Sequence, residues 1–145
     1  MIIPIVEYPN DVLRKKAEKI KDPKSPEVKR LILDMLETME DNGNALGLAA
    51  PQVNDSVRLC IIKFDRKTYI LINPKITGRS WKKETAEEGC LSFPGKFIPV
   101  KRHRKVTVKA QDRKGEKIII KADGLLARAL QHEIDHLDGI LFIDR

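Results

Sequence analysis

The stretch QHEIDHLDG, from Gln131 to Gly139, decides how the end of this chain folds and what chemistry it can hold. His132 and His136 lie four residues apart, and because an α-helix has about 3.6 residues per turn, a helix would place both imidazoles on one face. Glu133 directly follows the first histidine, a pattern in which the glutamate is the general base beside a bound metal. We therefore predict a helix that supplies two metal ligands and a catalytic base.

A plainer interpretation is that the two histidines lie on the exposed face of an amphipathic helix. The flanking residues Leu130, Ile134 and Leu137 argue against it, because they predict a largely buried helix. Buried imidazoles need polar partners, and a metal ion is such a partner. We expect this helix to begin after Asp123 as its N-cap and to end near Gly139.

Few residues follow His136, so the third ligand is expected upstream. Cys90 is the favoured candidate, because in EEGCLSFP it lies between a flexible glycine and a turn-compatible Ser-Phe-Pro. The other cysteine, Cys60, lies in an apolar strand and is expected to be a small buried hydrophobe rather than a disulfide partner. The remaining candidates for the third ligand are His103, Glu87 and Glu88.

The rest of the chain shows short helices and strands in an α+β order. A helix capped by Asn10 or Asp11 is expected to run through Lys16, and a second helix from Ser25-Pro26 to about Met39. The segment ALGLAAPQ is expected to be an irregular, partly buried loop. Antiparallel strands are predicted at residues 59–62, 68–72, 106–108 and 117–120, packed around the final helix.

Composition indicates a soluble single domain with a basic surface. The chain has 145 residues and a formal charge of +7, with no apolar run long enough to cross a membrane. The N-terminus carries no recognisable secretion or import signal, which favours the cytoplasm. The densest basic cluster, Lys101, Arg102, Arg104 and Lys105, has few aromatic neighbours, so direct sequence-specific nucleic-acid binding is not expected.

Three segments together resemble the peptide deformylase family. They are ALGLAAPQ (Ala45 to Gln52), EGCLS (Glu88 to Ser92) and QHEIDHLDG, and the opening YPNDVLRKKA extends the resemblance to nearly the whole chain. The resemblance implies hydrolysis of the N-formyl group from the formylmethionine of nascent polypeptides, with release of formate. It implies that Cys90, His132 and His136 bind one divalent ion, Fe²⁺ in cells, with Zn²⁺, Ni²⁺ or Co²⁺ possible in a purified sample.

The resemblance also implies roles for other residues around this metal. Glu133 would be the general base, and the Gln52 side chain and the Leu91 backbone N–H would stabilise the oxyanion. Substrate backbone would pair with Leu46, Gly47 and Gly89. The methionine side chain would enter a pocket that includes Leu46, Leu125, Ala129 and part of His132.

The chain departs from the family pattern at three points. Ala45 replaces a usual glycine, and Arg128 stands where an aliphatic residue is common, so we expect its stem to pack while its charged head reaches solvent. Residues 1–145 are expected to form a single catalytic domain that lacks the extended C-terminal tail of many bacterial members. Any association with the ribosome is then expected to be weak and to depend on the basic surface. Glu88 and Arg102 are either an ion pair that steadies the metal ligands or two solvated charges.

Two other functions fit parts of this pattern. A metallopeptidase or another amide hydrolase could use the same metal and glutamate, and its substrate would separate it from a deformylase. A non-enzymatic basic domain could hold a structural metal through four protein ligands, but a glutamate beside the metal disfavours that interpretation.

Overall fold

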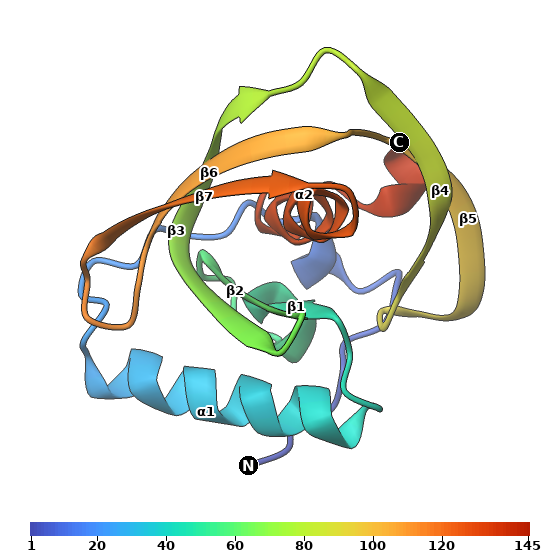
Figure 1. Ribbon diagram of the computed structural model, residues 1–145. Coiled ribbons are helices and arrows are strands. Elements are labelled where there is room, and N and C mark those ends of the chain that lie inside the picture. The colour runs from blue at the N-terminus through green and yellow to red at the C-terminus, as the bar shows by residue number, and fades with distance from the viewer.

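Two antiparallel sheets enclose one helix in the computed structural model, which describes all 145 residues (Figure 1). The larger sheet has five strands in the order β1-β2-β3-β6-β7, and the smaller pairs β4 with β5. The helices and strands are α1 (Pro26–Asp41), β1 (Gly47–Ala49), β2 (Leu59–Phe64), β3 (Lys67–Arg79), β4 (Lys83–Cys90), β5 (Phe93–His103), β6 (Lys105–Gln111), β7 (Lys117–Asp123) and α2 (Leu125–Leu137). The predicted α+β class, with antiparallel strands around a C-terminal helix, is confirmed.

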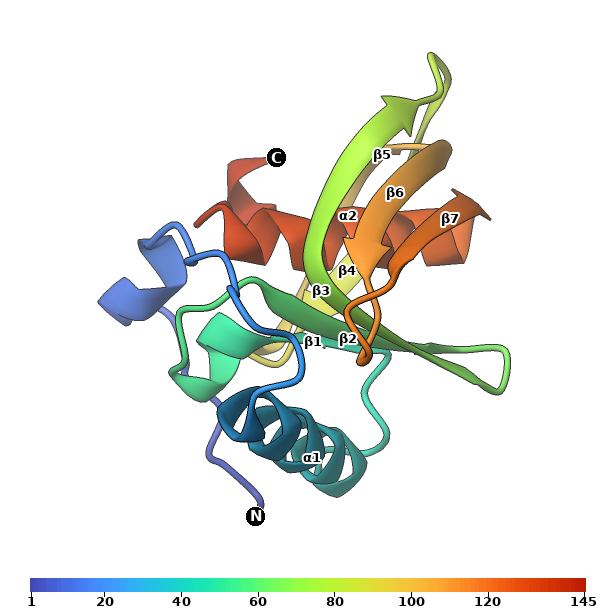
Figure 2. The same ribbon diagram turned by 90° about the vertical axis from the view of Figure 1, so that its left-hand side faces the viewer.

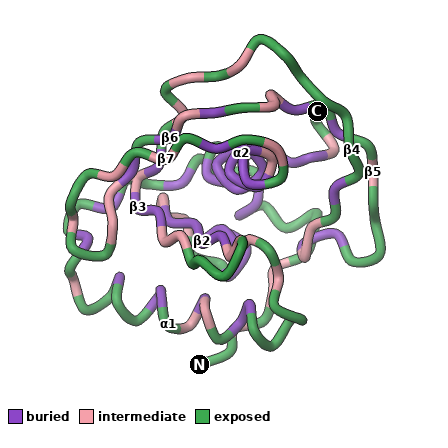
Figure 3. The backbone as a smooth tube through the Cα atoms, in the orientation of Figure 1, coloured by how far each residue is buried: buried purple, intermediate pink, exposed green.

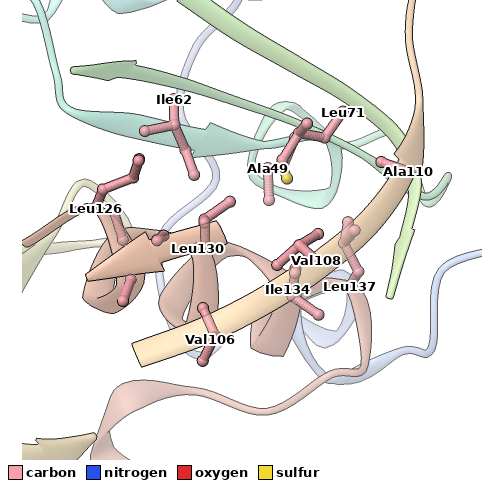
Figure 4. Packing of buried hydrophobic residues seen from close by; sticks show 14 of the residues in the cluster. Ala49, Ile62, Leu71, Val106, Val108, Ala110, Leu126, Leu130, Ile134 and Leu137 are labelled. Carbon is pink, nitrogen blue, oxygen red and sulfur yellow. The ribbon is translucent and has the colours of Figure 1, made fainter. Parts of the chain in front are cut away.

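Helix α2 is the centre of the molecule, and nearly all of its residues are buried (Figure 3). Figure 4 shows Leu130 and Ile134 of this helix among apolar side chains of the large sheet, including Ile62 of β2 and Val108 of β6. Truncating a leucine packed in this way to alanine costs about 2–5 kcal/mol in typical cores. This packing fixes the position of every polar group that the helix carries.

Helix α1 covers the other face of the same sheet (Figure 2). The Ser25 hydroxyl accepts a hydrogen bond from the Val28 N–H at 3.3 Å, and Pro26 occupies the first turn, so the helix begins where the sequence predicts. Its apolar stripe packs against Leu59 and Ile61 of β2, whereas Cys60 and Ile62 face α2. The first four residues of β2, Leu59 to Ile62, are all apolar because both faces of the strand are covered there.

The structure corrects several predicted elements. The segment ALGLAAPQ is not wholly irregular: Gly47–Ala49 pairs with β2 as an edge strand, and residues 50–53 form a 3₁₀ turn. Strands β4 and β5 were not predicted, because KETAEEGC is exposed and charged and has no apolar alternation to mark it as a strand. The chain around Cys90, from Lys83 to His103, is therefore a hairpin rather than a loop.

The ends of the predicted helices also differ from the observed ones. The first helix is a 3₁₀ turn over Asp11–Arg14 only, because the chain then extends so that the Ala17 N–H can reach the Leu137 carbonyl at 2.8 Å. Asp123 does not cap α2; it ends β7, and Gly124 precedes the helix with a φ of 63°. Gly139 follows the helix with a φ of 72°, as predicted. Neither long helix combines the length and apolar character that a membrane span requires.

Candidate active site

Strand β4 and helix α2 bring a thiol and two imidazoles together. The ligand atoms of Cys90, His132 and His136 all lie within 4.8 Å of one another, and the Cys90 Sγ is 3.4 Å from the His136 Nε2. Both histidines are buried, whereas Cys90 is half-buried at the end of β4, next to a bulge. Neither Cys90 nor Cys60 forms a disulfide. This is the donor set of a transition-metal site, a soft thiolate with two imidazoles.

The alternative third ligands lie elsewhere. The Nδ1 of His103 is 2.8 Å from the Ser80 carbonyl oxygen, on the turn that follows β3. Glu87 is exposed on β4. Glu88 contacts His132 at the ring nitrogen Nδ1, with 2.8 Å between the atoms, so it lies behind the imidazole rather than beside the sulfur. Among the candidates, the geometry therefore favours Cys90.

Glu88 is the centre of a buried network of charges. Arg102 donates to both of its carboxylate oxygens, each at 2.9 Å, and also to Asp135 of α2 at 2.5 Å. Burial opposes ionisation of Glu88, but the hydrogen bonds from His132 and Arg102 outweigh it and hold its pKa well below the ordinary value. The ion pair between Glu88 and Arg102 is thus buried rather than solvated. By engaging His132 Nδ1, it leaves Nε2 free to face the cluster.

Arg128 belongs to the same network, contrary to the expectation that its head reaches solvent. Its side chain is only 11% exposed, and it donates to Glu88 at 2.6 Å and to the carbonyl oxygens of Val100 and Glu84 at 2.8 and 2.7 Å. The prediction was wrong because sequence alone did not reveal a buried carboxylate within reach of residue 128. Paired in this way, the guanidinium avoids the cost of burying an unpartnered charge.

Glu133 lies beside the cluster and packs against a glycine. Its carboxylate is buried, and one oxygen, Oε1, has no hydrogen-bond partner. A Cβ on Gly47 would lie 2.5 Å from the other oxygen, Oε2, so a residue with no side chain is needed at that position. Burial raises the pKa of Glu133 to about 7, although the neighbouring His132 opposes the rise.

The charges around the cluster fit a bound cation. Burial lowers the pKa of His132, but its hydrogen bond with Cys90 and the nearby Glu133 and Glu88 outweigh this effect and raise it to about 10. The surroundings therefore stabilise a positive charge here. Burial, with the charges of His132 and Arg102, holds the pKa of His136 well below its ordinary value, so this imidazole stays neutral. At His132 a bound metal ion would take the place of the proton.

The cluster opens into a cleft of about 550 Å³. Gln52 is fixed at its wall: its Oε1 accepts from the Ala49 N–H at 3.0 Å, and its Nε2 donates to the Ser92 hydroxyl at 3.1 Å and to the Cys90 sulfur at 3.5 Å. All but one of the site residues predicted from the sequence line this cleft, namely Leu46, Gly47, Gln52, Gly89, Cys90, Leu91, Leu125, Ala129, His132 and Glu133. His136 lies deeper.

Sequence reasoning missed three residues near the site. Ser92 orients Gln52, and its place in EGCLS was the available signal. Asp135 holds Arg102, and its position within QHEIDH could have indicated it. Phe97 lines the cleft from β5, is 67% exposed and packs its ring against Gly89. No signal pointed to Phe97, because β5 was not predicted.

Comparison with known proteins agrees with this site. A family model described as polypeptide deformylase matches residues 2–145. The peptide deformylase of Thermodesulfovibrio yellowstonii is 50% identical over 99% of this chain and 88% of its own length. The crystal structure of the Thermotoga maritima peptide deformylase has a TM-score of 0.95 at 39% identity, and covers 100% of this chain and 97% of that one.

A structure with a bound tripeptide is also similar. It is the Met-Ala-Ser complex of the Acinetobacter baumannii peptide deformylase, with a TM-score of 0.93 at 33% identity over 100% of this chain and 98% of that one. Sequence, fold and the Cys–His–His cluster thus agree, and the chain belongs to the polypeptide deformylase family of metal-dependent hydrolases, which remove the N-formyl group from nascent polypeptides.

Proposed function

We propose that Cys90, His132 and His136 hold a single divalent ion and that Glu133 moves the protons of formyl hydrolysis. The observation that carries this proposal is the buried, unpartnered Glu133 oxygen beside three convergent ligand atoms that open into a cleft. The ion is Fe²⁺ in cells, although intrinsic affinity at a thiolate and imidazole site favours Zn²⁺, and Ni²⁺ or Co²⁺ can replace it in purified protein. Availability therefore decides which metal is present.

A divalent ion held by Cys90, His132 and His136 would supply a Lewis acid that polarises the formyl carbonyl and lowers the pKa of a water molecule in the cleft. Glu133 accepts the proton that this water loses, and later donates it to the departing amine of methionine. Formate and a free N-terminus are the products. One carboxyl serves both steps because it is buried next to the cluster and faces the cleft.

Two donors stabilise the oxyanion that develops on the formyl oxygen. They are the Gln52 side-chain amide, which its hydrogen bonds to Ala49 and Ser92 hold in place, and the backbone N–H of Leu91 in the turn after Cys90. Donors fixed before the reaction need no reorganisation when charge develops, and removing one typically costs about 10²–10³-fold in rate.

The substrate binds as an extended strand between the two sheets. Strand β1 pairs only with β2, and β4 only with β5, so each offers an unpaired edge, and Leu46, Gly47 and Gly89 at these edges line the same cleft. Main-chain pairing tolerates different downstream residues, as nascent chains require. The methionine side chain of the substrate enters the apolar part of the cleft, which is formed by Leu46, Leu125, Ala129 and the His132 ring. The similar Acinetobacter enzyme has been crystallised with Met-Ala-Ser bound, which supports a methionyl peptide as the ligand of this chain.

Replacing Glu133 by glutamine tests the assignment of the base. Glu133→Gln keeps the size of the side chain but cannot accept a proton, so formate release from formyl-Met-Ala-Ser should fall by about 10³-fold or more while metal content stays at one ion per chain. Glu87→Gln, an exposed neighbour on the same cleft wall, is the matched control and should retain activity. Near-normal turnover in Glu133→Gln would show that another group is the base.

Peptide selectivity separates this proposal from a metallopeptidase. The enzyme should release formate from formyl-Met-Ala-Ser and leave the internal bonds of the product intact, as mass spectrometry of the reaction would show. Cleavage of unformylated peptides instead would identify the rival activity.

We further propose that residues 1–145 act as one catalytic domain in the cytoplasm and meet nascent chains by associating weakly with ribosomes. The net charge of +7 supports this association, because ribosomes are polyanionic.

A further inference from the structure

A basic groove lies on the side of the molecule behind the charge network. It has a volume of about 410 Å³ and is bounded by β3, the beginning of β4, the end of β5 and helix α2. Four of its exposed cations make no ion pair, namely Lys75 and Arg79 on β3, Lys83 on β4 and Lys101 on β5. Four unneutralised cations along one groove form a site for an extended anion.

The acidic residues of the groove do not cancel this charge. Asp135 is paired with Arg102 and Arg145, and Asp138 with Arg58. The carboxylates are therefore already neutralised by cations other than the four exposed ones. The acidic Glu37 and Glu40 lie on α1, at the opposite end of the molecule (Figure 1).

A fully exposed tryptophan projects beside this groove. Trp81 is 101% exposed and stands in the turn between β3 and β4, flanked by groove residues Arg79 and Lys83. Figures 1 and 2 show this turn protruding at the top of the molecule. An indole with no packing partner costs hydrophobic free energy, so its exposure here calls for a partner outside the chain.

The turn that carries Trp81 is firmly held. The Ser80 N–H donates to the Lys105 carbonyl oxygen at 2.9 Å, and the Lys105 N–H donates to the Ser80 hydroxyl at 3.0 Å. The Ser80 carbonyl oxygen also contacts the Nδ1 of His103. On the other side, the Arg104 N–H donates to the Lys82 carbonyl at 3.0 Å. The indole is thus presented on an ordered platform rather than on a loose loop.

We infer that this groove and Trp81 together bind unpaired RNA without sequence specificity. The cations track the phosphodiester backbone, and the indole stacks on a base, which is the combination that single-stranded nucleic acids require. An anionic membrane is a weaker fit, because the cations line a concave groove and Trp81 stands without an apolar helix face beside it. The inference rests on the proposed ribosome association and names the surface and the chemistry that serve it.

Fluorescence of the holoenzyme with an oligouridylate tests the inference. Trp81 is the only tryptophan in the chain, so its emission should be quenched as bases stack on it, and labelled RNA should show a rise in anisotropy. Affinity should fall with salt with a logarithmic slope of about −3 if all four cations meet phosphates. Trp81→Ala should weaken binding about tenfold, and Trp81→Phe should restore most of the loss.

A charge-matched pair of triple variants provides the control. Lys75→Glu, Lys83→Glu and Lys101→Glu together should abolish RNA binding, whereas Lys29→Glu, Lys114→Glu and Lys117→Glu, which are exposed and outside the groove, should weaken it far less. Every variant should deformylate formyl-Met-Ala-Ser at the normal rate. The deformylation assay therefore tests the catalytic proposal separately, and loss of RNA binding alone concerns only the groove and Trp81. Equal loss in both triple variants, unquenched Trp81 emission, or binding to phosphatidylglycerol vesicles without binding to RNA would each overturn the inference.

Discussion

Replacing Gly47 by alanine should disable the enzyme through Glu133. The added methyl group would lie 2.5 Å from Oε2 and 3.0 Å from Cδ and Cγ of this side chain, all shorter than the 3.4 Å at which ordinary contact begins. Reaching that contact requires the carboxylate to move by 3.4 − 2.5 = 0.9 Å. The φ of Gly47 is not positive, so alanine introduces no backbone strain of its own.

A displacement of this size changes the reaction rate strongly. A misplacement of about 1 Å in a catalytic group can cost about 10²-fold, equivalent to about 2.7 kcal/mol of transition-state stabilisation. We therefore expect the kcat of Gly47→Ala for formyl-Met-Ala-Ser to fall about a hundredfold, with metal content and melting temperature close to those of the parent. Formate release and metal analysis on the same preparation measure both.

Two controls isolate the effect. Gly78→Ala places a methyl group 3.4 Å from Thr107, outside the cleft, and should be nearly silent. In a Glu133→Ala background, Gly47→Ala should cause no further loss, because the clashing carboxylate is gone. A full hundredfold loss in that background, or wild-type kcat in the single variant, would refute the reasoning.

Three further predictions follow from the buried and paired groups. Glu88→Gln should weaken metal binding about 10–100-fold, as measured by competition with a chelator, because Glu88 orients His132. It should also lower the free energy of unfolding in urea by about 3 kcal/mol, because the guanidinium groups of Arg102 and Arg128 stay buried without the carboxylate that neutralises them. Unchanged metal affinity would contradict the orienting role of Glu88. Cys60 is fully buried, and burial raises its thiol pKa well above the ordinary value, so a thiol reagent at mildly alkaline pH should modify Cys90 in the demetallated protein but reach Cys60 only on unfolding. The hydrogen bond from Arg14 lowers the pKa of Asp144 in the folded protein. The Asp144 carboxylate therefore stabilises the fold fully at pH values above 3.8, the pKa of the group in the unfolded chain, and this stabilisation is lost as the pH falls through the lower pKa of the folded protein. Asp144→Asn should therefore lower the melting temperature by about 2 °C at neutral pH and by less as the pH falls through that range, and an equal loss at every pH would contradict the pairing.

The local patterns of the sequence predicted much of the architecture. The apolar stripe and Ser25-Pro26 cap predicted α1 to within two residues of its observed end, and the apolar β2 and the histidine spacing in α2 were equally clear. Strands β4 and β5 escaped prediction because their residues are mostly exposed, and an exposed two-stranded sheet needs no apolar alternation. The N-cap of α2 was misplaced because Asp123 pairs with β6 before the helix begins.

The sequence by itself determined the fold class, the helix that carries His132, Glu133 and His136, and ten of the residues that line the cleft, although not Phe97. Tertiary structure alone decided how far Cys90 is from those histidines, that Arg128 turns inward to Glu88, and that Gly47 makes room for Glu133. The physical reason is range: periodicity and capping act between residues a few positions apart, whereas these contacts join residues separated by forty positions or more. Such contacts exist only after the two sheets close around α2 and water leaves the groups between them.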